Sequence, residues 1–231
     1  MKTPREDTAR TRGKLLAAAG EIFAEKGFRD ATIAEICTRA GANVAAVNYH
    51  FGSKENLYVA AWRHAFSESI RKHPPDGGVS EDAPSEERLR GQITALLERF
   101  ADDDNREFWF MQRELANPTG LLKEVMQEEI MPLRQRTETL VRELLGTRAS
   151  EQEVRFCEVG IISQCINPMV VRNRRNERPG ERKGPPGIDD IEAYARHVVT
   201  FSLAGIRAVR ETSEASRDRA AALTTEGGNL P

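Results

Sequence analysis

Almost the whole chain carries apolar residues at helical spacing, and this pattern constrains the fold more than any other feature. In residues 8–26, for example, Leu15, Leu16, Ala19, Ile22 and Phe23 fall on one helical face. The same periodicity predicts eight further helices over residues 33–40, 44–51, 53–72, 85–101, 105–116, 119–145, 150–172 and 188–210, with a kink at Pro132. We find no credible strand pattern. The predicted fold is therefore all-α, with about nine helices.

Composition narrows the class of protein. Hydrophobic residues make up 39% of the 231 residues and charged residues 30%, as in a globular protein that dissolves in water. No run of about 18 apolar residues predicts a membrane span, and the polar N-terminus lacks the apolar core of a signal peptide. The three cysteines are too few and too widely spaced for a disulfide framework or a zinc site. We expect a cytoplasmic protein that does not bind membranes.

The second and third predicted helices form a helix-turn-helix. Thr32 and Glu35 have the spacing of a capping box at the start of one helix, and Gly41 ends it. Asn43 can cap the next helix, which runs to Phe51. Small residues on this second helix would let its backbone approach base edges in a major groove. The alternative is a helical corner in which Tyr49 and His50 are half-buried packing residues.

Several side chains are candidates for contacts with DNA. Val44 and Ala45 can touch thymine methyl groups, and Asn48 can pair with an adenine edge or a phosphate. Tyr49 and His50 can reach phosphate oxygens, and Lys54 lies at a helix start, where an anion is favoured. The predicted DNA-binding residues are Thr32, Asn43, Val44, Ala45, Ala46, Asn48, Tyr49, His50 and Lys54.

The charge distribution is compatible with this interpretation. Residues 1–72 hold 12 Lys and Arg against 8 Asp and Glu, whereas the whole chain has a net charge of −2. A basic N-terminal segment followed by an acidic remainder is compatible with a DNA-binding head on a regulatory domain. Chance variation in surface charge explains the same numbers.

Residues 10–58 resemble the DNA-binding head of the TetR family of bacterial transcriptional regulators. The resemblance rests on "AAAGEIFAEKGF" in the first helix, on "TIAEI" in the second, and on "YHFGSKENL" across the third and fourth. It implies a homodimer with a helical C-terminal domain that binds a small ligand. Family members usually carry Gly or Pro in place of Ala45 and Tyr in place of Asn48. The operator therefore cannot be copied from a relative.

Two long helices predict the dimer interface. Apolar residues cover most of the circumference of helices 150–172 and 188–210, so each needs a partner on more than one side. We interpret them as half of a four-helix interface between two copies; the alternative is one bundle within a monomer. The predicted interface residues are Phe156, Val159, Ile162, Ile166, Val198, Val199, Ser202 and Ile206.

An aromatic and Met-rich set predicts an effector pocket between the fourth helix and residues 105–145. Such side chains line adaptable apolar cavities, and the charges of Arg113 and Glu114 among them would need partners. The alternative is ordinary core packing with Arg113 and Glu114 as a structural ion pair. The predicted effector-binding residues are Trp62, Phe66, Trp109, Phe110, Gln112, Arg113, Glu114, Met126 and Gln164.

No pattern for catalysis is apparent. The four histidines lack metal-ligand spacing, and neither a P-loop nor a dinucleotide-binding fingerprint occurs. We expect neither enzyme activity nor a cofactor or metal. A helical scaffold would not need the pattern of residues 41–58.

The sequence therefore predicts a transcriptional regulator that binds double-stranded operator DNA as a homodimer. We expect a repressor that an unknown small-molecule effector releases; an activator or a ligand-independent regulator is the alternative. The predicted organisation is a DNA-binding domain over residues 1–54, a ligand-binding and dimerisation domain over 55–212, and a disordered tail over 213–231. The basic, Pro/Gly-rich connector at residues 172–187 is expected to be a solvated loop.

Overall fold

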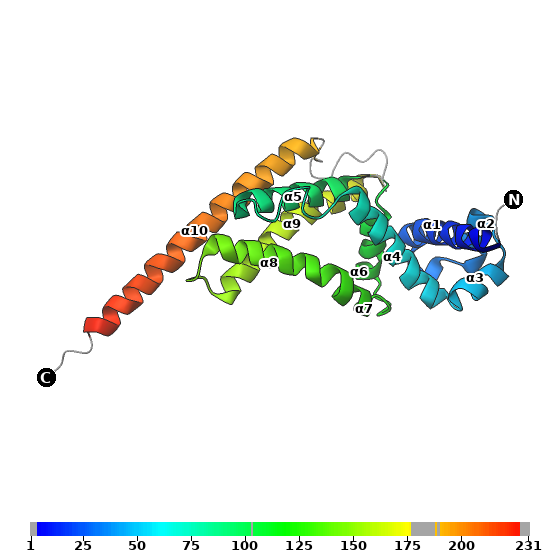
Figure 1. Cartoon of the computed structure of the whole chain (residues 1–231), viewed down its shortest axis with the longest axis horizontal. Helices are drawn as coiled ribbons and strands as arrows, with labels where there is room; N and C mark the ends of the chain where they lie inside the picture. Colours follow the sequence, from blue (N-terminus) through cyan, green and yellow to red (C-terminus); the bar gives the residue numbers. More distant parts are fainter. Residues whose placement is uncertain (1–3, 103, 177–187, 189, 227–231) are drawn as a thin grey trace. The chain divides into compact units, whose positions relative to one another are not determined.

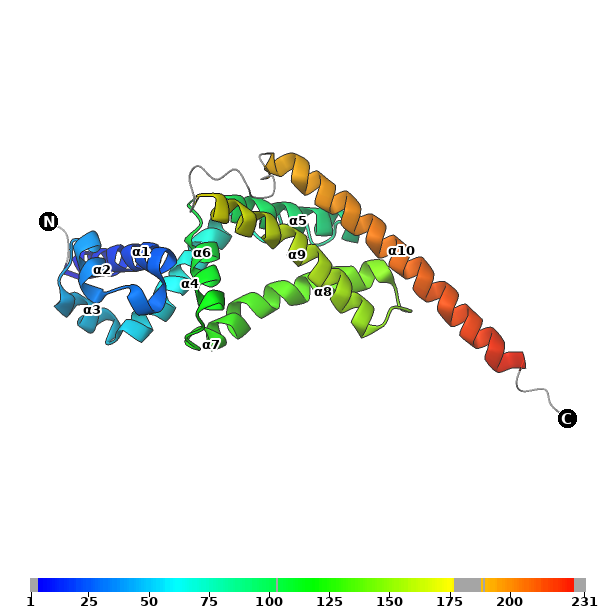
Figure 2. The ribbon, with the colours of Figure 1, turned by 180° about the vertical axis from the view of Figure 1, so that it is seen from behind.

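The computed structural model describes residues 4–102, 104–176, 188 and 190–226 (Figures 1 and 2). Its helices are α1 (Pro4–Asp30), α2 (Ile33–Ala40), α3 (Val44–Phe51), α4 (Lys54–Lys72), α5 (Ser85–Ala101), α6 (Arg106–Ala116), α7 (Lys123–Val125), the π-helix η1 (Met126–Ile130), α8 (Met131–Leu145), α9 (Glu151–Asn176) and α10 (Ile191–Glu226). These residues include no strand, which confirms the all-α prediction. None of the helices described is both long enough and apolar enough to cross a lipid bilayer.

The chain divides into two compact units. Unit 1 comprises residues 1–72 and 102–131, and unit 2 comprises residues 73–101 and 132–231. Within unit 1, α4 and α6 both pack against α1. The predicted DNA-binding domain, residues 1–54, is thus part of a larger compact unit.

Aromatic rings form the core of unit 1. The Phe23 ring lies 4.9 Å from the ring of Tyr58 on α4 and 5.8 Å from the ring of Phe110 on α6. All three side chains are at most 1% exposed. The first helix of the predicted head is therefore joined to α6 through shared apolar packing. The predicted stop at Gly27 appears as a break in α1, where φ is +78°.

The predicted helix over residues 119–145 begins at Lys123 instead and contains a π turn. It consists of α7, η1 and α8, and the amide of Met131 donates to the carbonyl of Met126, five residues back. Pro132 follows directly, lacks an amide hydrogen and crowds the carbonyl four residues before it. The wider π turn relieves this crowding, so the predicted kink takes the form of a π-helix.

In unit 2, α10 lies beside α5 and α9 (Figures 1 and 2). Leu89, Val198 and Val199 are at most 1% exposed in its core. Pro168 interrupts the hydrogen bonding of α9, because it offers no amide to the carbonyl of Gln164. The Tyr194 hydroxyl on α10 donates to this carbonyl at 3.0 Å and so satisfies it.

The prediction of a disordered tail from residue 213 is wrong for the residues described, because α10 continues to Glu226. The C-terminal part of α10 has no stripe of apolar residues, and polar contacts stabilise it instead. Ser213, 7% exposed, donates to Glu153 on α9, and Arg148 pairs with Asp218. A helix already formed extends at little cost, so such contacts suffice. Residues 227–231, and residues 177–187 of the predicted connector, lie outside the described part.

Candidate DNA-binding surface and effector cavity

Helices α2 and α3 form the predicted helix-turn-helix. Gly41 ends α2 with φ +61° and ψ +41°, a left-handed conformation that glycine adopts without strain. Asn43 then caps α3, and its side-chain oxygen accepts the amide hydrogen of Ala46 at 2.9 Å. Val47 and Phe51 anchor α3 to the unit, since they are 1% and 8% exposed. The opposite face of α3 is exposed.

The predicted base-reading side chains share this exposed face of α3. Val44 is 50% exposed and Tyr49 78%, and Ala45 and Asn48 are also exposed. Ala46 and His50 are half-buried. No acidic residue lies in the first turn of α3, so no carboxylate of that turn repels phosphates.

Thr32 is less available than predicted. Its hydroxyl and its amide both donate to the Glu35 carboxylate, which completes the capping box at the start of α2. Hydrogen bonds from Lys26 and from Thr32 lower the pKa of Glu35 to about 2, so this carboxylate is charged at neutral pH. The start of α2 therefore already holds an anion. A phosphate contact by Thr32 stays a prediction, and it would require Glu35 to move.

Two cations of unit 1 lie against aromatic rings. The Lys54 ammonium is 4.6 Å from the centroid of the Phe28 ring, and the Arg12 guanidinium is 5.4 Å from that of Phe51. Neither cation has a carboxylate partner among the described residues. A ring orients a cation without neutralising it, so both remain able to bind phosphate. Arg12 is not among the predicted DNA contacts, because only the fold brings α1 to the end of α3.

We expect Lys54→Ala to weaken binding to all DNA sequences alike. Losing one phosphate contact should reduce the slope of log affinity against log salt concentration by about one. Lys26→Ala is the matched control, since Lys26 is already paired with Glu35. Fluorescence anisotropy titrations at several salt concentrations measure both slopes. An unchanged slope for Lys54→Ala would remove this residue from the contacts.

For Asn48→Ala we expect altered preference at one or two base pairs, because the exposed amide faces the groove side of α3. The preferred site should lose about 1–3 kcal/mol of binding free energy. Selection from a randomised DNA pool with both proteins gives the two preferred sites. The same site with uniformly weaker binding would make Asn48 a phosphate contact instead.

The predicted effector-binding residues are divided between the two units. Trp62, Phe66 and Phe110 are at most 6% exposed and fill the interior of unit 1. Trp109, Gln112 and Met126 are half-buried in unit 1, whereas Gln164 belongs to unit 2. Close packing explains the burial of these aromatic side chains, and a ligand contact by the nine residues stays a prediction.

No ion pair joins Arg113 and Glu114 in the described part of the chain. Arg113 is exposed and donates from Nε to the carbonyl of Ala24 at 3.4 Å. Glu114, 9% exposed, accepts instead from the Tyr58 hydroxyl at 2.8 Å and from the Thr119 amide at 2.9 Å. The buried charge is thus balanced by hydrogen bonds that join α6, α4 and the turn after α6.

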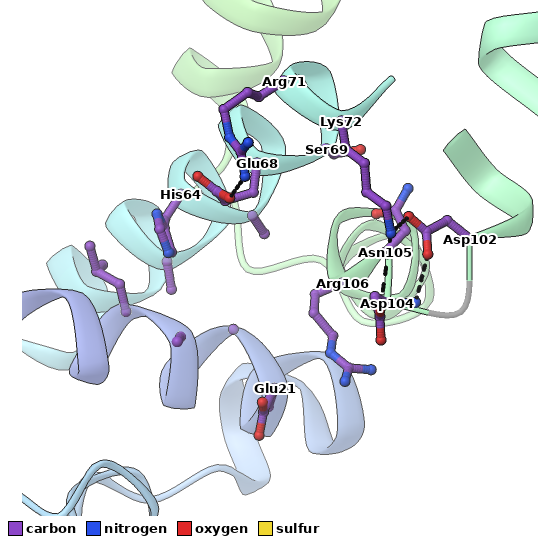
Figure 3. A pocket seen from close by; sticks show the side chains of 15 residues that line it. Glu21, His64, Glu68, Ser69, Arg71, Lys72, Asp102, Asp104, Asn105 and Arg106 are labelled. Carbon is purple, nitrogen blue, oxygen red and sulfur yellow. Dashed lines mark hydrogen bonds and ion pairs between the residues drawn. The ribbon is translucent and has the colours of Figure 1, made fainter. Parts of the chain in front are cut away.

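A cavity of about 360 Å³ lies elsewhere in unit 1, between α1, α4 and the start of α6 (Figure 3). None of the nine predicted effector-binding residues lines it. The lining instead includes four small residues, which leave the space open: Ala17, Gly20, Ala61 and Ala65. The polar lining includes His64 from α4 and Arg106 from the first turn of α6.

The predicted dimer surface is only partly exposed. Phe156 and Val159 on α9 are 63% and 46% exposed, and Phe201 on α10 is 61% exposed. Ile162 and Ile166 are half-buried. The four residues predicted on α10, namely Val198, Val199, Ser202 and Ile206, are instead at most 6% exposed. They face the core of unit 2, so the outward face of α10 is the one with Phe201.

Comparisons with known proteins agree with this architecture. The family model of the bacterial regulatory proteins of the tetR family matches residues 15–61. The model of the C-terminal domain of the HTH-type transcriptional dual regulator CecR matches residues 85–206. CecR of Shigella flexneri is 32% identical over 148 residues, which cover 60% of this chain and 66% of that protein. The transcriptional repressor AcnR of Corynebacterium jeikeium is 24% identical over 195 residues, 82% of this chain and 94% of that protein.

A solved structure has the same fold. A TetR-like transcriptional regulator from Rhodococcus sp. RHA1 superposes with a TM-score of 0.61 at 18% sequence identity, over 85% of this chain and 96% of that one. The alignments with CecR and two further curated relatives span 66%, 27% and 42% of those proteins, less than two thirds of each length.

The helix-turn-helix head and the helical C-terminal part together are the architecture of one class of DNA-binding regulators. The chain belongs to the TetR family of bacterial regulatory proteins. Residues 15–61 thus match the DNA-binding head of this family, whose members are transcriptional regulators and not enzymes.

Proposed function

We propose that this protein is a homodimeric repressor whose complex with operator DNA is released by a small-molecule effector. The proposal rests on the position of helix α4. This single helix begins with Lys54 beside the helix-turn-helix and lines the cavity with His64 and Glu68 further along. A molecule bound in the cavity would therefore contact the same rigid element that places a phosphate anchor.

The exposed apolar face of α9 and α10 supports a dimer. Phe156, Val159 and Phe201 present large apolar side chains to solvent in the single chain, and a second copy would cover them. A dimer places two α3 helices on successive major grooves, about 34–36 Å apart. Because an effector that disfavours this spacing weakens DNA binding, linkage requires DNA to weaken effector binding by the same factor. Such a regulator acts in the cytoplasm.

Activation is the second candidate for the outcome at the promoter. The relative CecR is named a dual regulator, whereas AcnR is named a repressor. Operator binding is common to both outcomes, so the distinction lies in where the operator sits relative to the promoter.

The test is selection of operator sequences by the full-length protein from a randomised duplex pool. We expect a pseudo-palindromic site, bound as one dimer per duplex, and reduced reporter expression from a promoter that contains it. Enrichment of no sequence would overturn the proposal. A bound site with increased reporter expression would make the protein an activator.

A further inference from the structure

We propose that the cavity between α1, α4 and the start of α6 binds a small organic carboxylate, whose charged group is received by Arg106. The assignment as a binding site rests on the cavity itself. Its role as the effector site rests in addition on the proposed function.

The cavity has an apolar floor. Leu16, Ala17 and Gly20 from α1 meet Ala61 and Ala65 from α4 at its lining. Gly20 is buried, yet a Cβ added there would find no atom within 4 Å, so the space over it is open. About 360 Å³ lies within the range of small-molecule sites. The floor suits a compact apolar body.

Most charges around the cavity are already paired. Arg71 bonds Glu68 at 2.6 Å, and Lys72 bonds Asp102 at 2.7 Å. The Glu21 carboxylate at the α1 side is bonded by Arg39 at 3.2 Å. Arg106 is exposed and has no hydrogen-bond or ion-pair partner among the described residues. In Figure 3 its side chain projects from the start of α6 toward the α1 side of the cavity. The cavity therefore presents one unpaired guanidinium.

Two further polar groups line the same space. The Ser69 hydroxyl is buried, since the residue is 7% exposed, and it has no hydrogen-bond partner among the described residues. Leaving such a group unpaired costs about 1–3 kcal/mol, which a polar ligand atom would offset. His64 on α4 adds an imidazole that can donate one hydrogen bond.

These groups favour a carboxylate over other anions. The planar guanidinium binds a carboxylate through two parallel hydrogen bonds. The carboxylates of the lining (Glu21, Glu68, Asp102 and Asp104) outnumber its Lys and Arg side chains (Arg71, Lys72 and Arg106). This excess of negative charge would repel a doubly charged phosphate more than a singly charged carboxylate. An apolar group on the ligand would pack against the Ala and Gly residues that line the cavity. The ligand class is a monocarboxylate with a compact apolar group.

Calorimetric titration of the full-length protein without DNA tests the site, with 1-naphthoate as the probe and 1-naphthamide as its neutral analogue. We expect naphthoate to bind and naphthamide to bind at least about tenfold more weakly, because only the carboxylate pairs with the guanidinium. Arg106→Gln should weaken naphthoate binding by about tenfold or more. Arg29→Gln should leave it unchanged, because Arg29 of the same unit is exposed, does not line the cavity and has no ion-pair partner among the residues that the structure describes.

A second pair of variants tests the location. Gly20→Leu places a side chain in the cavity and should abolish binding of naphthoate. Gly13→Leu, on the same helix and away from the cavity lining, should not. Circular dichroism checks that each variant is folded. If Gly20→Leu does not fold, the binding measured with Arg106→Gln decides whether the cavity is the site. Absence of naphthoate binding, equal binding of naphthamide, or full binding by Arg106→Gln would each overturn the proposal. So would competition by inorganic phosphate as strong as that by naphthoate.

Operator titration separates this site from the proposed function. Release of operator by naphthoate from the original protein, but not from Arg106→Gln, would support the effector role. Naphthoate binding without release would keep the site and overturn its effector role. Failure to bind any operator in the absence of naphthoate would contradict the proposed function and leave the calorimetric result for the site intact.

Discussion

Replacing Phe201 by Glu should leave the chain folded but monomeric, and operator affinity should fall by about 100-fold or more. The Phe201 side chain is 61% exposed in the single chain, so its replacement buries no charge within one copy. In the proposed dimer the new carboxylate would be buried without a partner, which costs about 3–5 kcal/mol. One head alone makes too few contacts to hold an operator tightly.

Val199→Glu provides the contrasting variant on the same helix. Val199 is 1% exposed in the core of unit 2, so a carboxylate there should unfold the chain rather than separate two copies. Ser216→Glu adds the same charge at an exposed position further along α10 and should change neither assembly nor affinity. Sedimentation velocity and operator titration on the same samples measure both effects. A monomeric Phe201→Glu protein with undiminished operator affinity would contradict the dimer mechanism.

Glu114→Ala should lower the free energy of unfolding by about 3 kcal/mol, because it removes an acceptor that several buried or half-buried donors share. The Glu114 carboxylate accepts from the Tyr58 hydroxyl at 2.8 Å, from the Thr119 amide and hydroxyl at 2.9 Å, and from the Gly120 amide at 3.3 Å. Burial, together with the neighbouring carboxylate, raises the pKa of Tyr58, so its hydroxyl stays protonated and donates. Chemical denaturation of the full chain, followed by circular dichroism, measures the loss.

Tyr58→Phe tests whether the loss comes from this network. Alone it should cost about 1 kcal/mol, since Glu114 keeps its other donors. In the Glu114→Ala background it should cost almost nothing, because the buried hydroxyl has already lost its acceptor. Glu124→Ala, at an exposed position of the same unit, is the control and should be neutral. Additive losses for Tyr58→Phe and Glu114→Ala would mean that the two side chains are not coupled.

The sequence predicted the helices and several of their ends because the signals are local. Capping at Thr32 and Asn43, the left-handed Gly41 and the break near Pro132 depend on a few neighbouring residues. In residues 44–51 the sequence likewise predicted Asn48 and Tyr49 as candidate DNA contacts, and both side chains are exposed in the structure. The candidate DNA surface could therefore be derived almost entirely from sequence.

The cavity between α1, α4 and the start of α6 could not be derived in this way. A pattern records that Phe110 is apolar, but it does not say whether the ring fills the core or faces a cavity. The structure places Phe110 against Phe23 and Tyr58, and it opens space where Gly20 and Ala61 meet instead. Cavities arise where small residues from different helices face one another, and these residues lie far apart in the chain.

The sequence by itself determined an all-helical chain with a helix-turn-helix head, since periodicity, caps and turn glycines act over a few residues. Only the tertiary structure decided which face of α10 is exposed. The sequence of a helix that is apolar nearly all round does not show which face will be buried. Packing against α5 and α9 turned Val199 into the core and left Phe201 at the surface. The tertiary structure also brought Arg12 onto Phe51 and Ser213 onto Glu153. No local pattern reveals these contacts, because the residues of each pair lie far apart in the chain.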